Sequence, residues 1–131
     1  MGSREVSRWF GEYLDAFAAC GRGERDTASL LAFYGVPLLI ATDDGCLALT
    51  SNDQVVAAVQ PQLDGMRAAE YARSEILGSE VNVLNSTSAL YRGTFSYQRS
   101  DGSEIRRLTA TYLVTAAAGD RRISVLAVHS P

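Results

Sequence analysis

The stretch EIRRLTATYLVTAAAGDRRISVLAVH, residues 104–129, decides the fold of this chain. Apolar and polar residues alternate in it with a period of two, which is typical of β-strands, over 104–117 and again over 122–129. Between the two runs, Ala-Gly-Asp at 118–120 has the composition of a tight turn, so the runs are predicted to pair as an antiparallel hairpin.

The same period of two extends upstream and enlarges the predicted sheet. Strands are expected over 71–84 and 87–99, and Ser-Asp-Gly-Ser at 100–103 supplies the turn before the final hairpin. Gly78 and Gly93 lie inside these strand patterns, where glycines usually mark bulges or sharp bends. Long, bent strands predict a curved and mostly antiparallel sheet.

Helical spacing replaces the period of two in the N-terminal half. Residues 4–20 predict a helix with one apolar stripe. That stripe contains Val6, Trp9, Phe10, Tyr13, Leu14, Phe17 and Cys20. A second, short helix is expected to begin after Asp26, to include Phe33 and Tyr34, and to end at Gly35.

A small hairpin and a third helix are expected next. The apolar run 36–41 and residues 46–49 predict two short paired strands around a Thr-Asp-Asp-Gly turn. Ser-Asn-Asp-Gln at 51–54 matches a capping box and predicts the start of a helix. Pro61 lies inside that helical pattern, so a kink or a break is expected there.

These elements predict one α+β domain over residues 1–131, with three N-terminal helices packed in the concave face of a curved, mostly antiparallel sheet. The chain is 47% hydrophobic and 21% charged, with a net charge of −3, which is typical of a globular protein and unlike a general nucleic-acid binder. The longest apolar run, 36–41, is too short for a membrane span. We therefore expect a cytoplasmic protein with no nucleic-acid or membrane partner.

Cysteine and arginine usage adds two smaller expectations. Cys20 and Cys46 are too few for a disulfide framework or a metal site, and both are predicted to be buried thiols. Arg99, Arg106 and Arg107 flank one turn and are interpreted as a solvated edge that discourages strand addition. No metal-ligand spacing or phosphate-binding loop is present, so neither a metal nor a cofactor is expected.

The order of elements and four short segments resemble the nuclear-transport-factor-2-like superfamily. The segments are EYLDAF at 12–17, LLAFY at 30–34, DGSEI at 101–105 and RRISVLAVH at 121–129. The superfamily includes ketosteroid isomerases, polyketide-cyclase-like proteins, scytalone dehydratase and limonene epoxide hydrolase, and usually carries Trp where Arg121 stands. The resemblance implies a cone-shaped, cystatin-like roll with a pocket between sheet and helices. All twelve basic residues are Arg, a usage typical of GC-rich bacterial genomes.

The resemblance also implies which catalytic groups to look for. Tyr13 matches the first-helix tyrosine that donates to an oxyanion in isomerase-like members, although a core tyrosine is the alternative interpretation. These members place a carboxylate base on the strand after the second helix, where this chain has only apolar residues followed by Asp43 in a turn. Residues 105–118 contain no acid. Ketosteroid isomerisation is therefore not expected.

Two other chemistries of the superfamily find few matching residues. His129 is the only histidine and is a candidate general base, whereas scytalone dehydratase-like chemistry requires more than one. The Asp-Arg-Asp set of limonene epoxide hydrolase has no clear counterpart. Arg73 and Glu75 share one strand face and form either a polar pair at the pocket or a solvated surface.

Two hypotheses about function follow. In the first, the protein binds a small apolar molecule, with an isomerase-, cyclase- or hydrolase-like activity left unassigned. The candidate catalytic residues are Tyr13 and His129. The predicted ligand-binding residues are Trp9, Tyr13, Phe17, Tyr34, Tyr91 and Thr111, and Thr109 is the alternative to Thr111. In the second, the chain is a non-catalytic, dimeric interaction module whose cavity its own side chains fill. A cavity of a few hundred Å³ favours the first hypothesis.

The outer face of the sheet predicts a homodimer. One parity of the strand 104–117 contains Ile105, Thr109, Thr111 and Leu113, and the other contains Leu108, Ala110, Tyr112 and Val114. Whichever parity faces the helices, the other leaves apolar side chains outside. A second copy of the chain is the simplest cover for that face. The sequence leaves open which parity faces inward.

Overall fold

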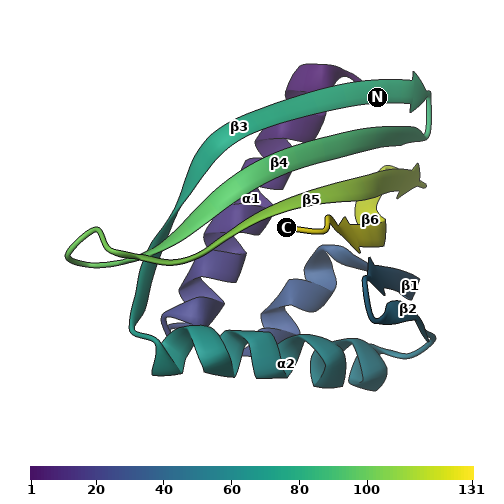
Figure 1. The fold of residues 1–131 in the computed structure, drawn as a ribbon. Coiled ribbons are helices and arrows are strands. Elements are labelled where there is room, and N and C mark those ends of the chain that lie inside the picture. The colour runs from purple at the N-terminus through teal and green to yellow at the C-terminus, as the bar shows by residue number, and fades with distance from the viewer.

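The computed structural model describes residues 1–131, and its elements follow the predicted order (Figure 1). They are α1 (Ser3–Gly21), the short 3-10 helix η1 (Thr27–Ala32), β1 (Tyr34–Thr42), β2 (Gly45–Leu49), α2 (Asn52–Ala68), β3 (Tyr71–Asn85), β4 (Ser88–Arg99), β5 (Glu104–Ala117) and β6 (Asp120–Val128). The strands form one sheet in the order β2-β1-β6-β5-β4-β3. All neighbours are antiparallel except β1 and β6, which are parallel.

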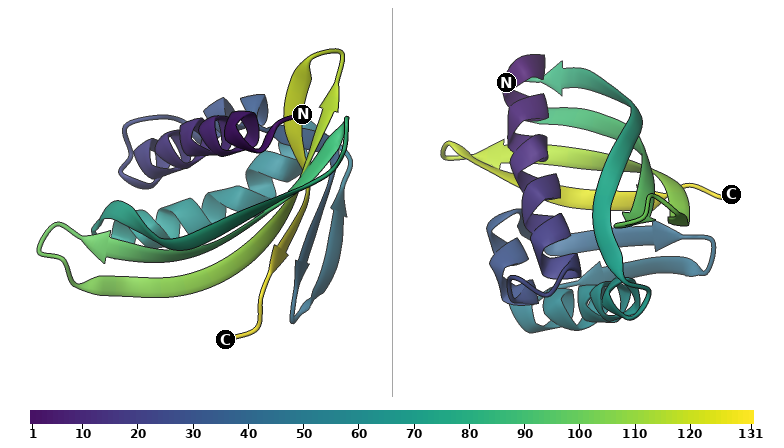
Figure 2. Two further views of the ribbon diagram at one scale, coloured as in Figure 1. Left: turned by 90° about the horizontal axis from the view of Figure 1, so that it is seen from above. Right: turned by 90° about the vertical axis from the view of Figure 1, so that its left-hand side faces the viewer.

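The α+β class and the curved sheet are confirmed. The sheet does not close on itself, and the long strands β3, β4 and β5 bend around the helices (Figure 1). Viewed from above, the helices lie on one side of the strand layer, which is its concave side (Figure 2). The helix α1 crosses behind β3 to β5, and α2 lies along the lower end of the sheet in the view of Figure 1.

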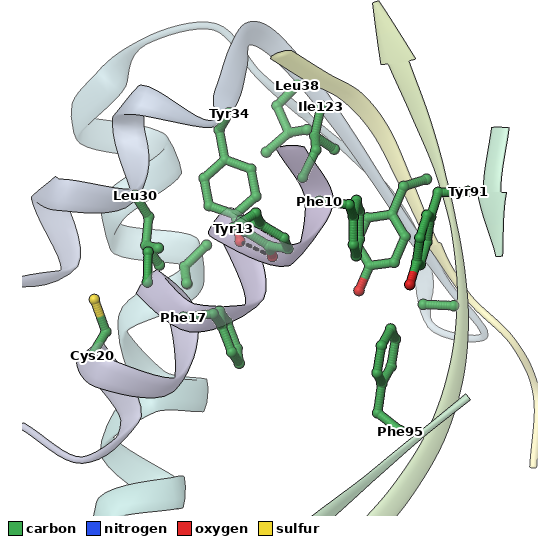
Figure 3. Packing of buried hydrophobic residues seen from close by; sticks show 14 of the residues in the cluster. Phe10, Tyr13, Phe17, Cys20, Leu30, Tyr34, Leu38, Tyr91, Phe95 and Ile123 are labelled. Carbon is green, nitrogen blue, oxygen red and sulfur yellow. Dashed lines mark hydrogen bonds between the residues drawn. The ribbon is translucent and has the colours of Figure 1, made fainter. Parts of the chain in front are cut away.

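An aromatic core joins α1 to the sheet. The apolar stripe of α1 places Val6 and Phe10 with no exposed surface against the concave face. The Phe10 ring stacks on Tyr91 with 3.7 Å between centroids (Figure 3). The same ring meets Tyr112 edge-on at 4.6 Å. These contacts fix the distance between the helix and the strands, and hence the width of the space beside them.

The short helix and α2 differ from the prediction in one detail each. Residue Tyr34 starts β1 instead of ending a helix, because Ile123 N–H donates to the Phe33 carbonyl at 2.7 Å and draws this segment into the sheet. The expected break at Pro61 is wrong, since α2 continues through it. Pro61 is exposed, and the buried face of α2 holds the helix in place; that face consists of Val55, Val59, Leu63 and Met66.

Of the two interior strand glycines that were expected to mark bulges or bends, one lies at a bulge and the other does not. Gly78 lies beside a register shift, which confirms a bulge there. Gly93 lies in an unbroken register, where an added Cβ would come within 2.5 Å of Phe95 Cζ, so it leaves room for a buried ring.

Cys20 is buried, but Cys46 is exposed because it lies on the edge strand β2. The prediction of two buried thiols is therefore wrong for Cys46.

The structure settles the strand parity that the sequence left open. Leu108, Ala110, Tyr112 and Val114 lie on the concave face of β5, while Thr109, Thr111 and Leu113 lie on the convex face. Ile105 is the exception. The sequence grouped it with the convex residues, yet it packs against the core on the concave side.

Candidate functional site

A cavity of about 600 Å³ lies between the concave face of the sheet, α1 and α2. Of its 25 lining residues, 15 are hydrophobic, contributed by both helices and by strands β1, β4, β5 and β6. This size is that of a small-molecule site rather than of a packing defect. The polar groups that interrupt the apolar wall therefore decide what the cavity can hold.

Four tyrosines of this wall form what we call the phenol cluster, namely Tyr13, Tyr34, Tyr97 and Tyr112. They come from α1, β1, β4 and β5, and none is more than 7% exposed. The hydroxyls of Tyr13 and Tyr34 hydrogen bond to each other at 2.7 Å (Figure 3). The hydroxyls of Tyr97 and Tyr112 have no protein partner, and both residues face the cavity.

Burial keeps these phenols protonated. Desolvation raises the pKa of Tyr34 to about 12, and it raises the pKa of Tyr13, Tyr97 and Tyr112 above the ordinary value. The neighbouring phenols raise the pKa of Tyr13 and Tyr112 further, because charge on one would face its neighbours. At neutral pH the cluster therefore presents O–H donors to the cavity.

Carboxylates are confined to one side of the cavity mouth. Asp43 and Asp44 are the only acidic lining residues, and both are exposed in the turn between β1 and β2. The Asp43 carboxylate accepts a hydrogen bond from Ser130 Oγ at 2.6 Å. Glu75 and Arg73 are exposed and do not line the cavity. The cavity thus has hydrogen-bond donors among its buried lining residues but no buried carboxylate.

The single histidine lies at the cavity mouth with one ring nitrogen engaged. His129 Nε2 hydrogen bonds with Thr111 Oγ1 at 2.7 Å, and its backbone N–H donates to the Thr109 carbonyl at 2.9 Å. Both threonines lie on the convex side of β5, away from the phenol cluster. This arrangement holds the imidazole at the strand end rather than beside the tyrosine hydroxyls.

The structure brings together some of the predicted wall residues and separates others. Tyr13, Phe17, Tyr34 and His129 line the cavity, whereas Trp9, Tyr91 and Thr111 do not. Trp9 packs against Phe33 with 5.6 Å between ring centroids, and Tyr91 is covered by Phe10. Sequence reasoning missed Tyr97, Tyr112 and Arg106. Once Leu108 is known to face inward, simple alternation along β5 identifies Tyr112.

Arg106 lines the cavity beside a β-bulge. The register places Gln98 opposite Glu104 and Tyr97 opposite Arg106, so Ile105 is an extra residue on β5. Ile105 and Arg106 therefore both line the cavity, although consecutive strand residues normally point to opposite faces. Arg106 is exposed, as expected, but the prediction of an edge position is wrong, because β5 lies between β4 and β6 and Arg106 borders the cavity.

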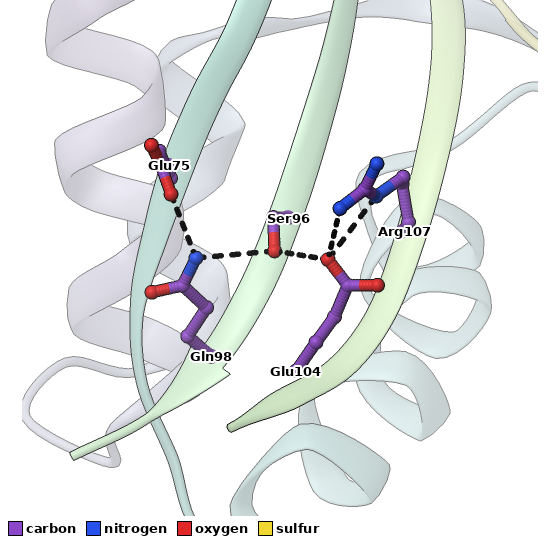
Figure 4. Close-up of polar contacts among 5 residues, drawn as sticks. All are labelled: Glu75, Ser96, Gln98, Glu104 and Arg107. Carbon is purple, nitrogen blue, oxygen red and sulfur yellow. Dashed lines mark hydrogen bonds and ion pairs between the residues drawn. The ribbon is translucent and has the colours of Figure 1, made fainter. Parts of the chain in front are cut away.

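The convex side of the same bulge carries a chain of polar contacts (Figure 4). Arg107 donates twice to a Glu104 oxygen at 3.1 Å, and that oxygen also accepts from Ser96, which is only 2% exposed. Gln98 donates to Ser96 at 3.2 Å and to Glu75 at 2.9 Å. The Ser96 hydrogen bond, followed by Arg107, lowers the pKa of Glu104. Strand alternation thus places a paired arginine, Arg107, outside and Arg106 on the cavity side.

No three or more His, Cys, Asp or Glu side chains gather in a way that could hold a metal ion. None of the helices combines the length and the apolar composition needed to cross a bilayer.

Comparisons with known proteins agree on the fold. Residues 4–131 match the sequence model of a family described as NTF2-like protein (DUF6841), while a search of curated proteins found no match. A putative calcium/calmodulin dependent protein kinase II association domain from Xanthomonas campestris aligns at TM-score 0.73 and 17% identity, over 100% of this chain and 89% of its own. An NTF-2 like protein of unknown function from Shewanella oneidensis aligns at TM-score 0.71 and 14% identity, over 95% and 99%.

A third solved structure carries the same fold description. A domain of unknown function with a cystatin-like fold from Nostoc punctiforme aligns at TM-score 0.71 and 18% identity, over 100% of this chain and 80% of that chain. Identities this low show a common fold and leave the chemistry to the residues of the cavity.

Proposed function

This chain belongs to the NTF2-like family DUF6841, and we propose that it binds a small, largely apolar molecule with an oxygen acceptor that the phenol cluster holds. The observation that supports this most is the pair of unpartnered hydroxyls, on Tyr97 and Tyr112, in a cavity of about 600 Å³. Both hydroxyls are open to the cavity and free to donate, and a ligand carbonyl or ether oxygen would accept hydrogen bonds from them.

The same geometry limits the chemistry we assign. Protonated phenols polarise a carbonyl oxygen, which is the first half of an isomerase- or cyclase-like step. The second half requires a base, and the cavity acids are restricted to the exposed turn that contains Asp43. We therefore propose binding and polarisation, with no assigned proton transfer. The exposed free thiol of Cys46 favours a reducing compartment such as the cytoplasm.

Binding of a neutral fluorescent probe tests occupancy of the cavity. N-phenyl-1-naphthylamine should bind with increased fluorescence, because the wall is mostly apolar. Ala110→Phe should abolish binding, since Ala110 is fully buried and lines the cavity. Ala48→Phe on the exposed edge strand is the matched control and should bind normally. If Ala110→Phe fails to fold, Leu126→Trp on β6 blocks the same space. Probe binding that survives both substitutions would exclude this cavity.

Competition by matched ligands tests the role of the hydroxyls. We expect 2-acetylnaphthalene to displace the probe better than 2-ethylnaphthalene, which lacks the carbonyl oxygen. The ratio of the ketone's affinity to that of 2-ethylnaphthalene should fall by about fivefold to tenfold in Tyr112→Phe, because that variant loses one hydrogen bond to the ketone oxygen. Tyr71→Phe is the control, because the Tyr71 hydroxyl is bonded to Ser74 and does not line the cavity. An unchanged ratio in Tyr112→Phe would refute the proposed role.

We also propose that two copies of the chain pair through the convex face of the sheet. That face carries apolar side chains beside both acidic and basic ones, as a self-complementary two-fold interface requires. The apolar ones include Leu39, which is 39% exposed, and the partly exposed Leu113 and Val125. The cavity volume supports the ligand-binding hypothesis over a module with a filled cavity, and a dimer is compatible with both.

Light scattering tests the proposed dimer. The chain mass is 14.1 kDa, so a wild-type value near twice that mass is expected at micromolar concentration. Leu113→Glu should give monomers, because it places a charge in the centre of the convex face. Leu47→Glu is the control, since Leu47 is 57% exposed but pairs with Ile40 on the concave side. A wild-type mass of one chain would refute the dimer.

A further inference from the structure

We infer that the ligand of this cavity is an amphipathic anion, an apolar molecule whose carboxylate or comparable acidic group is bound at the cavity mouth by Arg106. The inference rests on the proposed function, because it names the chemical class of the molecule that occupies the cavity. It is carried by the position of Arg106, by its lack of a partner and by the apolar wall that continues from it along β5 towards Tyr112.

Arg106 is the only Lys or Arg among the residues that line the cavity. It makes no hydrogen bond and no ion pair, in contrast to Arg107, which is paired with Glu104 on the other face of the strand. A guanidinium presents five donors in a rigid fork that matches a carboxylate. The alternation along β5 thus places one free anion-binding group on the cavity side and leaves its neighbour paired outside.

The acidic residues of the mouth lie away from Arg106. Asp43 and Asp44 belong to the turn between β1 and β2, and the strand order places β6 between β1 and β5. Asp43 is already engaged by Ser130. An anion at Arg106 would therefore be separated from these carboxylates by the width of β6, while a cationic ligand would have to avoid Arg106.

The wall beyond Arg106 defines the rest of the ligand. On the concave face of β5, Arg106 is followed by Leu108, Ala110 and Tyr112, all of which line the cavity. Six residues of strand separate Arg106 from Tyr112, a distance of about 20 Å between backbone positions. The apolar residues between them fit a ligand with an acid at one end, an apolar body and an oxygen near Tyr112 at the other end, with Tyr97 opposite Arg106 as a second donor beside the acid.

Two probes with the same ring skeleton separate this inference from the proposed function. N-phenyl-1-naphthylamine is neutral, and 8-anilino-1-naphthalenesulfonate is the same molecule with an added sulfonate. We expect the wild-type chain to bind the sulfonate probe more tightly than the neutral one. Arg106→Gln should weaken the sulfonate probe about tenfold and leave the neutral probe unchanged. Arg107→Gln is the matched control and should change neither.

Ionic strength and aliphatic competitors provide a second readout. Affinity for the sulfonate probe should fall with added salt, because an exposed guanidinium is screened, while neutral-probe affinity should not. Dodecanoate should displace the neutral probe better than dodecan-1-ol or dodecylamine in the wild type, and this order should disappear in Arg106→Gln. Arg106→Lys, which keeps the charge without the fork, should restore part of the preference.

The outcomes are distinct. No binding of the neutral probe would refute the proposed function itself. Neutral-probe binding together with a sulfonate affinity that is insensitive to Arg106→Gln would overturn the anion inference alone. If dodecylamine displaced the probe better than dodecanoate, Asp43 and Asp44 would be the groups that bind the ligand's charge, and the anion inference would also be overturned.

Discussion

Removing the hydroxyls of Tyr13 and Tyr34, singly and together, gives the sharpest test of the phenol cluster. The two oxygens are 2.7 Å apart and each residue is 3% exposed. Tyr13→Phe leaves the Tyr34 hydroxyl without its partner, which costs about 1–3 kcal/mol in a closed interior. Because both residues line a cavity that admits water, we expect the lower end, about 1 kcal/mol for each single variant.

The double variant distinguishes this hydrogen bond from general packing. With both hydroxyls removed no donor is orphaned, so the double variant should lose about as much stability as one single variant. The coupling free energy would then be about 1 kcal/mol. Tyr112→Phe is the control: its hydroxyl has no partner, so its removal should leave the free energy of unfolding unchanged or raise it by up to about 1 kcal/mol.

Urea unfolding followed by far-ultraviolet circular dichroism measures these differences. A change of 1 kcal/mol corresponds to about 4 °C in the melting temperature of a chain of this size. The m-value should remain constant, since the same surface is exposed on unfolding. Strict additivity of the single variants, or a loss in Tyr112→Phe as large as that in Tyr13→Phe, would refute our account of the cluster.

Three further predictions concern packing, pH and activity. Gly93→Ala should destabilise the fold by about 1–3 kcal/mol because its Cβ would lie 2.5 Å from a ring atom of the buried Phe95, whereas Gly78→Ala, with no atom within 4 Å, should cost less than 1 kcal/mol in the same melts. Burial raises the pKa of Tyr34 from 10 to about 12, so its contribution to stability, about 2–3 kcal/mol, is complete below pH 10 and is lost as pH rises from 10 through 12; a flat unfolding midpoint over that interval would contradict the burial. The chain should show no appreciable Δ5-3-ketosteroid isomerase activity in a direct absorbance assay, since no buried carboxylate lines the cavity, and turnover comparable to that of a genuine isomerase would disprove this.

Local periodicity was sufficient for most of the fold. The strands that start at Tyr71 and Glu104 begin within one residue of the predicted positions, because alternation reports directly on which backbone positions face a core. The parity of the sheet was not predictable, since both faces of β5 carry apolar residues. Ile105 was grouped with the wrong face for a related reason. A bulge opposite Tyr97 shifts the register, and register depends on the neighbouring strand rather than on the strand's own sequence.

The candidate site was less predictable than the fold because its polar groups meet only in three dimensions. Tyr13, Tyr34, Tyr97 and Tyr112 come from four elements, and each alone is indistinguishable in sequence from a core aromatic residue. What distinguishes these four positions from an ordinary core is that each carries tyrosine and not phenylalanine. Phenylalanine would fill nearly the same volume, whereas Tyr97 and Tyr112 add hydroxyl donors that no protein group uses and that remain open to the cavity. These two donors support our proposal of a ligand oxygen in the cavity, and the guanidinium of Arg106 at the mouth, which has no protein partner, extends that proposal to the ligand's other end.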